Sequence, residues 1–537
     1  MILVFLVTAW LGYWAAYDSD VAWNKAWLIV TAVLLYYCLR EQPKENLIWV
    51  SVILFCLGVG VSFYYFLTYD FISAPRRIDV VNNIGRWFMK IRPQTGWTSI
   101  HPNYVAGVVA VTMPFIFFPF LKFKEGNVHP PVLFYVFAAT GLSATGLALV
   151  MATSRGVAMA ILSGAGVWLL WRLIHLSGIK RRIQSRAVFP FLVLIYLLTV
   201  IATLYIGPAK SGSVFTDTYF YGTGSRAELF GRSMYLVLDY PIVGGGLGAF
   251  PGLYSQYLLN IPFFNVVNSH NLFLDVAIEQ GLLGGLSLAI LYVASLWVAA
   301  DSIANRNSDR AFGWIVLFSL AVAIIHGMVD DYLYNGIGSI LSLFLVGLAF
   351  NGNQVNKFVV RRLDFRTAGA IFLIWAAIVM VNLNLLRSIW YANLGAIQQA
   401  KVELKSFPDA GWAGYNIVSQ LDEASSTLQM SLQFDPENRT ANQRLGMIAM
   451  LRHEFESAVV FLEVAHLQAP GHRGIIKSLG YSYAWLGDLG NAELFLSQTP
   501  EAKEELDVYI WWWDAQGRKD LSEKASLILD VLNEASP

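Results

Sequence analysis

Long apolar segments alternate with short polar stretches from Met1 to Leu386. Each segment is long enough to cross a hydrocarbon core of about 30 Å as a helix. We count eleven, centred near residues 9, 30, 58, 112, 141, 165, 198, 285, 320, 343 and 377. The first starts at Met1 with no basic flank and no A-x-A-like cleavage site, which indicates a first span rather than a signal peptide. The pattern predicts a transmembrane helical domain over residues 1–387.

After residue 387 the pattern changes to a repeat with a period of 34 residues. The recurring positions are Ala424, Ala458 and Ala492, Pro436 and Pro470, and Leu445-Gly446 and Leu479-Gly480. This period is typical of helix-turn-helix solenoids, and it resembles about two and a half tetratricopeptide repeats. The sequence therefore predicts an all-α protein, with a C-terminal α-solenoid over residues 388–537. Such arrays bind other proteins, so we expect a possible protein partner there.

The composition excludes an ordinary soluble enzyme, because 56% of the residues are hydrophobic and only 14% are charged. The net charge is zero, but the two parts of the chain carry net charges of opposite sign. Residues 388–537 hold 20 acidic and 11 basic side chains, whereas residues 1–387 hold 17 acidic and 26 basic ones. We therefore expect a membrane domain with a soluble acidic tail, and no nucleic-acid partner. Cys38 and Cys56 both fall in predicted spans, so no disulfide framework or thiolate metal site follows.

The basic residues of the short loops predict the orientation, because such loops stay in the cytoplasm. The loops over residues 172–186 and 357–366 carry five and four lysines and arginines. Alternation from these loops places a large loop, residues 209–270, and the C-terminal domain outside the cytoplasm. One loop does not fit. Residues 70–102 carry five basic side chains but fall on the outer face, so either the span count is wrong there or these charges meet an anionic ligand.

A histidine borders the span that follows the large loop. His270 lies in Asn268-Ser-His-Asn271, just before the apolar run from Leu272. A histidine at a helix start is often only a cap or an interfacial residue. Asp275 and Glu279 follow inside the apolar helix, where carboxylates are costly, and they could orient the imidazole or line a polar cavity. No second histidine stands at a zinc-type spacing, so we expect no metal site.

Two arginines also lie on the predicted outer face. Arg226 opens an amphipathic helix that runs to Asp239, and Arg155 falls between two spans. Guanidinium groups bind pairs of oxygen atoms, so these two suit a phosphate or diphosphate. The alternatives are a surface pair with Glu228 or with phospholipid headgroups for Arg226, and a snorkelling or interhelical role for Arg155.

Further substrate-binding candidates are His101, Arg232 and Asn271. Pro102 offers a structural explanation for part of the His101 motif, since proline favours the first helical turn. Five glycines between residues 244 and 252 could bring backbone close to a bulky ligand. Asp330 and Asp331 form another outer-face cluster, which we expect to be structural.

The order of these motifs resembles the bacterial O-antigen ligases and their relatives, the O-antigen polymerases and protein O-oligosaccharyltransferases. The resemblance covers roughly residues 80–350. The motifs that carry it are Thr153-Ser-Arg-Gly156, Arg226 with its helix, the glycine-rich stretch from Asp239 to Phe250, and Ser269-His-Asn-Leu-Phe-Leu274 continuing to Gly284. The resemblance implies a helical bundle similar to C-type glycosyltransferases, placed in the bacterial cytoplasmic membrane.

The resemblance also implies a reaction. The donor would be a glycan on undecaprenyl diphosphate, and the acceptor a glycan, lipid or protein hydroxyl. Arg226 and Arg155 would hold the diphosphate without a metal ion or cofactor, and His270 would orient or deprotonate the acceptor. The ligase, polymerase and protein-glycosylating members of this group differ in their acceptor. The motifs leave that choice open.

Two non-enzymatic interpretations compete with this one. A transporter of lipid-linked glycans also needs arginines that face a cavity, but it predicts internal repeat symmetry and interrupted helices near the midplane, which the sequence does not clearly show. A membrane scaffold would use the spans only as an anchor for the C-terminal domain. Eleven spans are far more than an anchor needs.

Overall fold

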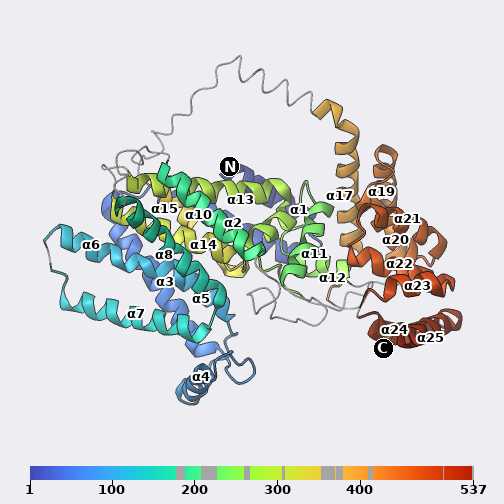
Figure 1. Cartoon of the computed structure of the whole chain (residues 1–537), viewed down its shortest axis with the longest axis horizontal. Coiled ribbons are helices and arrows are strands. Elements are labelled where there is room, and N and C mark those ends of the chain that lie inside the picture. Colours follow the sequence, from blue (N-terminus) through green and yellow to red (C-terminus); the bar gives the residue numbers. More distant parts are fainter. Residues whose placement is uncertain are drawn as a thin grey trace.

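The computed structural model describes residues 1–127, 129–176, 188–206, 226–258, 266–304, 309–351, 369, 379–408, 415–499 and 501–534. These residues form helices, and no β-strand occurs among them. A bundle of apolar helices makes up one part of the molecule, and a stack of shorter helices from the C-terminal region makes up the other (Figure 1). The prediction of an all-α protein is therefore confirmed.

Seven helical segments in the described part are long and apolar enough to cross a membrane. They are Ser19–Arg40 (α2), Lys44–Thr68 (η1 and α3), Pro102–Glu125 (α5, η2 and α6), Val132–Ala152 (α7), Arg155–Ile174 (within α8, Arg155–Leu176), Leu272–Ala304 (α13) and Arg310–Gly327 (α14). The chain is thus a multi-pass membrane protein.

The expected eleven spans are only partly matched. Three of the predicted segments are shorter apolar helices, Ile2–Ala15 (α1), Val188–Thr203 (within α10, Val188–Ile206) and Gly336–Ala349 (η3 and α15). The segment predicted near residue 377 lies mostly outside the described residues. Of these three segments α1 has 14 residues, whereas α10 has 19, one more than the span formed by α14.

Glycines allow the glycine-rich loop to pack against the bundle. Gly281 kinks α13 with a φ of 76°, and Gly244 lies beside it with a φ of 81°. A Cβ on Gly244 would lie 2.3 Å from the Glu279 carbonyl oxygen, so no other residue fits there. The amide of Gly245 donates a 2.7 Å hydrogen bond to the carbonyl of Ile278. At these positions the glycines allow close approach to other backbone, and the approach of this loop to a ligand stays a prediction.

Two short helices from the large loop lie beside the bundle. They are α11 (Arg226–Asp239) and α12 (Phe250–Leu258), which sit between the spans and the C-terminal helices (Figure 1). A further short helix, α4 (Asp79–Ile91), lies at the edge of the bundle beyond the end of α3 (Figure 1).

The C-terminal helices follow the 34-residue period. After α17 (Leu383–Glu403) and α18 (Tyr415–Val418) come α19 (Asp422–Phe434), α20 (Arg439–Leu451), α21 (Phe455–Gln468), α22 (Arg473–Leu486), α23 (Leu489–Leu496), α24 (Ala502–Ala515) and α25 (Lys519–Glu534). The recurring alanines are buried between paired helices, Ala458 and Ala492 both having no exposed surface. Leu462 packs closely against Gly446 of α20, which explains why a glycine recurs there.

The C-terminal helices dock on α11 and α12 through buried polar groups. Asp239, at the end of α11, accepts hydrogen bonds from Arg439 at 2.6 Å and Thr440 at 2.7 Å. Arg444 lies 3.5 Å from the second oxygen of Asp239 and donates to the Tyr240 hydroxyl at 3.1 Å. Burial would raise the pKa of Asp239, but the two arginines outweigh burial and the pKa is lowered. The carboxylate therefore stays ionised inside this interface.

Candidate functional site

An open cavity with about 780 Å³ of empty space lies where connecting loops meet the ends of the spans. It is formed by segments that are far apart in the sequence. Its lining residues are Arg76, Arg77, His101, Asn103, Thr153, Ser154, Arg155, Gly156, Arg226, His270, His326 and Val329. The structure therefore brings together four of the six predicted site residues, namely His270, Arg226, Arg155 and His101.

The conformation around His270 is fixed by hydrogen bonds within its own loop. His270 has a φ of 56°, an uncommon value for a residue with a side chain. Its amide donates to the side-chain oxygen of Asn268 at 3.1 Å, and the preceding amide, of Ser269, donates to Asp275 at 2.9 Å. Asp275 thus holds the loop from inside α13, and His270 is aimed at the cavity.

His270 is neutral at physiological pH. Burial lowers its pKa to about 3, and the neighbouring Arg226 and His101 add to this effect. A neutral imidazole has one nitrogen that can accept a proton. The site therefore holds His270 in the form that can accept a proton, and the same burial makes it a weaker base than free histidine.

Arg226 brings a positive charge next to His270. It donates a 3.0 Å hydrogen bond to the carbonyl of Val329, which fixes its position in the cavity wall. Burial lowers its pKa; Asp330 opposes this shift, whereas the nearby Arg155 and Arg77 add to it. Three guanidinium groups thus repel one another across the cavity. An anion placed among them would relieve that repulsion.

Arg76 attaches the basic loop to the end of α7. Its side chain donates to the Ala152 carbonyl and to the Thr153 hydroxyl, the latter at 3.1 Å. The side chain of Asn82 bonds both backbone groups of Arg76 at 2.6 Å. No individual role was predicted for Arg76 and Arg77 from the sequence. The excess of positive charge in a loop predicted to lie on the outer face was the signal that could have identified them.

Two more histidines line the cavity. His101 caps α5 by accepting a 3.3 Å hydrogen bond from the amide of Asn103, and desolvation by the surrounding protein, with Arg76 and Arg226, lowers its pKa to about 4. His326 is completely buried against the ring of Tyr332, 4.7 Å away between centroids. Neither ring nitrogen of His326 has a hydrogen-bond partner among the described residues. The sequence did not predict His326 as a site residue.

The other two predicted substrate-binding residues do not line the cavity. Arg232 is buried on α11, 3.6 Å from Glu228. It follows Arg226 by six residues, which turns it about 240° around the helix from Arg226. Asn271 caps α13, accepting from the amides of Phe273 and Leu274 at 3.1 Å. In this structure both residues support the elements that carry the site.

The nearby carboxylates serve the framework. Glu279 forms a 2.7 Å ion pair with Lys25 of α2, so it does not line the cavity. Asp330 and Asp331 are buried beside the cavity. Burial raises the pKa of Asp330 to about 6 although Arg226 opposes the shift, and burial together with Asp275 raises the pKa of Asp331. Among the described residues, no group of three histidine, cysteine or acidic side chains is placed to hold a metal ion.

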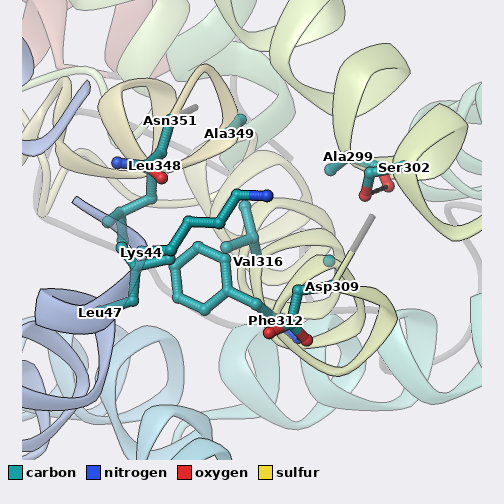
Figure 2. A pocket seen from close by; sticks show the side chains of 11 residues that line it. Lys44, Leu47, Ala299, Ser302, Asp309, Phe312, Val316, Leu348, Ala349 and Asn351 are labelled. Carbon is teal, nitrogen blue, oxygen red and sulfur yellow. Dashed lines mark hydrogen bonds between the residues drawn. The ribbon is translucent and has the colours of Figure 1, made fainter. Parts of the chain in front are cut away.

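A second cavity lies at the other end of the spans, with about 540 Å³ of empty space (Figure 2). Its polar side chains include Lys44, Asp309 and Asn351. Asp309 pairs with Lys122 at 2.5 Å, and Asn351 donates to the carbonyls of Leu39 and Gln42 at 2.9 and 2.8 Å. These partners tie loops together, and the lining contains no histidine. The first cavity is therefore the stronger candidate for chemistry.

Comparison with known proteins points to one superfamily. The family model described as O-Antigen ligase matches residues 140–289, a range that includes Arg155, Arg226 and His270. A curated protein, the ComP-specific O-oligosaccharyltransferase of Acinetobacter baylyi (strain ATCC 33305 / BD413 / ADP1), is 23% identical over 320 residues, which are 58% of this chain and 52% of the relative. The chain thus spans about half the length of that relative. No solved structure matches. Both matches support the ligase superfamily that the motifs resemble.

Proposed function

We propose that this protein transfers a glycan from a lipid-linked diphosphate, undecaprenyl diphosphate, to an acceptor hydroxyl. The observation that carries the proposal is the arrangement of Arg77, Arg155 and Arg226 around a neutral His270 in one cavity at the ends of the membrane spans. A lipid-borne diphosphate matches both the charge of the cavity and its position. The family match over the same residues supports the proposal.

In the proposed reaction the acceptor hydroxyl oxygen attacks the anomeric carbon of the donor glycan. The bond between that carbon and the diphosphate oxygen breaks, and the diphosphate leaves with the electron pair. His270 takes the proton from the acceptor hydroxyl. The arginines stabilise the negative charge that develops on the leaving group, which is the role that a metal ion has in many phosphate-transfer enzymes. We therefore expect transfer to persist in the presence of EDTA.

We further propose that the cavity faces the outside of the bacterial cytoplasmic membrane. The C-terminal helices contact the far end of α11, whose first residue lines the cavity, so both would lie on that side. The resemblance of these helices to tetratricopeptide repeats favours recruitment of a protein. One relative is described as a ComP-specific O-oligosaccharyltransferase. A protein acceptor is therefore the second candidate beside a glycan or lipid acceptor.

Deleting the gene and measuring the lipid-linked glycans of the source organism tests the proposal. Long polymer accumulating on the carrier at the outer face indicates a ligase, and single repeat units accumulating there indicate a polymerase. Short oligosaccharides on the carrier together with the loss of a glycoprotein indicate protein glycosylation. Accumulation at the cytoplasmic face would contradict the proposal in favour of a transporter, and an unchanged profile would contradict any role in glycan transfer.

A further inference from the structure

The helix α4 has an exposed apolar stripe that the proposed activity does not use. Val80, Ile84, Trp87 and Ile91 follow one another at spacings of four, three and four residues, so they share one face of the helix. All four are exposed, Val80 by 64% and Trp87 by 61%. A continuous apolar face of this kind is unfavourable in water. It marks a surface that contacts another apolar phase.

The remaining residues of α4 divide into two other sectors. Val81 and Gly85 face inward, and Gly85 lies so close to the Phe71 ring that a Cβ would be 2.3 Å from it. Asn83, Arg86 and Lys90 are exposed and lie along one side of the apolar stripe. One sector of the helix therefore packs against the protein, the second sector is apolar, and the third is cationic. This combination is typical of a helix that lies in a membrane surface, with its cations at the level of the lipid headgroups.

Hydrogen bonds fix α4 at the depth where two spans end. Arg92, directly after α4, donates to the carbonyls of Phe66 and Tyr69 at the end of α3, both at 2.8 Å. Arg76, before α4, bonds the carbonyl of Ala152 at the end of α7. Both ends of the helix are thus attached to the ends of membrane-spanning segments. That level corresponds to the boundary between the hydrocarbon and the headgroups.

The spans to which α4 is attached also expose apolar side chains. Along α3 and α7 the exposed residues include Ile53, Phe63 and Val150. Near the end of α3, Tyr64 stacks on Trp97, with 5.8 Å between the ring centroids, and Trp97 is itself exposed. Tryptophan at this depth is characteristic of membrane interfaces.

We propose that α4 is an interfacial membrane helix, with Val80, Ile84, Trp87 and Ile91 inserted among the lipid acyl chains and Arg86 and Lys90 among the headgroups. The inference does not depend on the proposed glycan transfer. It places Arg76 and Arg77, which precede α4 and line the cavity, at headgroup depth. The mouth of the cavity is then level with the phosphate groups of membrane lipids.

Spin labelling of the full-length protein in lipid bilayers tests this proposal. The two native cysteines, Cys38 and Cys56, are first replaced by alanine, and single cysteines are introduced as Val80→Cys and Ile84→Cys for the stripe and Asn83→Cys for the polar side. Ile53→Cys on α3 is the lipid-exposed reference and Asp530→Cys on α25 the aqueous one. Collision rates with oxygen, which concentrates in lipid, and with a water-soluble nickel chelate measure the surroundings of each nitroxide.

We expect the labels at Val80 and Ile84 to collide with oxygen as the Ile53 label does and to be shielded several-fold from nickel, whereas the Asn83 label behaves as the Asp530 label does. Nickel collisions at Val80 and Ile84 equal to those at Asp530 would overturn the proposal, because the stripe would face water. Shielding from both reagents would also overturn it, because a protein would then cover the stripe. Ile91→Cys provides an independent stripe position if either variant fails to fold.

Discussion

Arg439 of the C-terminal helices donates a 2.6 Å hydrogen bond to Asp239, the last residue of the helix that begins with Arg226. One helix thus carries a cavity arginine at its start and the attachment point of the C-terminal helices at its end. The contact is buried, with Asp239 only 1% exposed. It links a unit that resembles a protein-binding repeat to the proposed active site.

Replacing Asp239 with asparagine should loosen this attachment. The change removes the carboxylate that pairs with the buried Arg439 and Arg444, and breaking a buried pair costs roughly 3–5 kcal/mol. The temperature at which a protease releases the C-terminal helices from the detergent-solubilised protein measures the effect. Since the pKa of Asp239 is lowered, its stabilising contribution is present at neutral pH and lost only as the pH falls through that lowered pKa.

An exposed ion pair provides the matched control for this variant. Arg518 and Asp520 lie 2.9 Å apart on the surface of the C-terminal helices. Because water screens such a pair, Asp520→Asn should leave the release temperature unchanged. Equal effects of the two substitutions would show that the buried contact does not hold the C-terminal helices in place.

The pH dependence of glycan transfer should reflect the lowered pKa of His270. Because burial and Arg226 bring this pKa to about 3 in the free protein, the imidazole remains a neutral base as the pH falls. We therefore expect kcat/KM for the donor to show no acidic limb from a histidine between pH 8 and about 5. A limb centred near the ordinary histidine pKa of about 6.5 would contradict the electrostatic description of the site.

Asp275 should act as a positioning residue. It holds the amide of Ser269 at 2.9 Å and so fixes the loop that carries His270. Asp275→Ala removes the acceptor and should lower kcat by about 100-fold through misplacement of the imidazole, with little change in KM. Asp275→Asn keeps an oxygen acceptor and should recover most of the activity. If the two variants have the same kcat, the hydrogen bond from Ser269 to Asp275 does not position His270.

Arg155 should contribute to binding of the diphosphate. Loss of one charged hydrogen-bonding partner is worth about 1.5–3 kcal/mol, so Arg155→Ala should weaken donor binding roughly 10- to 100-fold. Arg155→Lys should restore only part of the donor affinity, because lysine keeps the positive charge but not the paired hydrogen-bond donors of arginine. Lys124→Ala, on an exposed lysine at the end of α6, is the control. Unchanged donor affinity in Arg155→Ala would remove this arginine from the proposed site.

Much of the fold followed from local patterns. The 34-residue period located the C-terminal helices, because α20 and α22 begin exactly one period apart, at Arg439 and Arg473. Apolar runs located the membrane helices, and seven of the expected segments are long enough to span a membrane within the described residues. The role of the glycine-rich loop could not be predicted, since Gly244 and Gly281 face each other only after the chain has folded.

For the candidate site, the sequence predicted only those residues that lie in a recognisable motif. His270, Arg226, Arg155 and His101 line one cavity, and the sequence predicts that all four lie on the same face of the membrane. Arg232 does not line the cavity. It was predicted from its closeness to Arg226 in the sequence, but its side chain leaves the helix in a different direction. His326 joins the cavity through contacts between distant segments that no local sequence pattern encodes, and Arg76 and Arg77 were marked only by the excess of basic residues in their loop.

The central claim is that His270 and Arg226 carry out glycan transfer. The most direct measurement is transfer from an undecaprenyl-diphosphate-linked glycan by the purified protein in liposomes, comparing His270→Ala and Arg226→Ala with Asp530→Ala, a substitution at an exposed position of α25. We predict that both cavity variants insert normally and lose about 100-fold or more in rate, whereas the control retains the original rate. Full activity in both cavity variants would contradict the account.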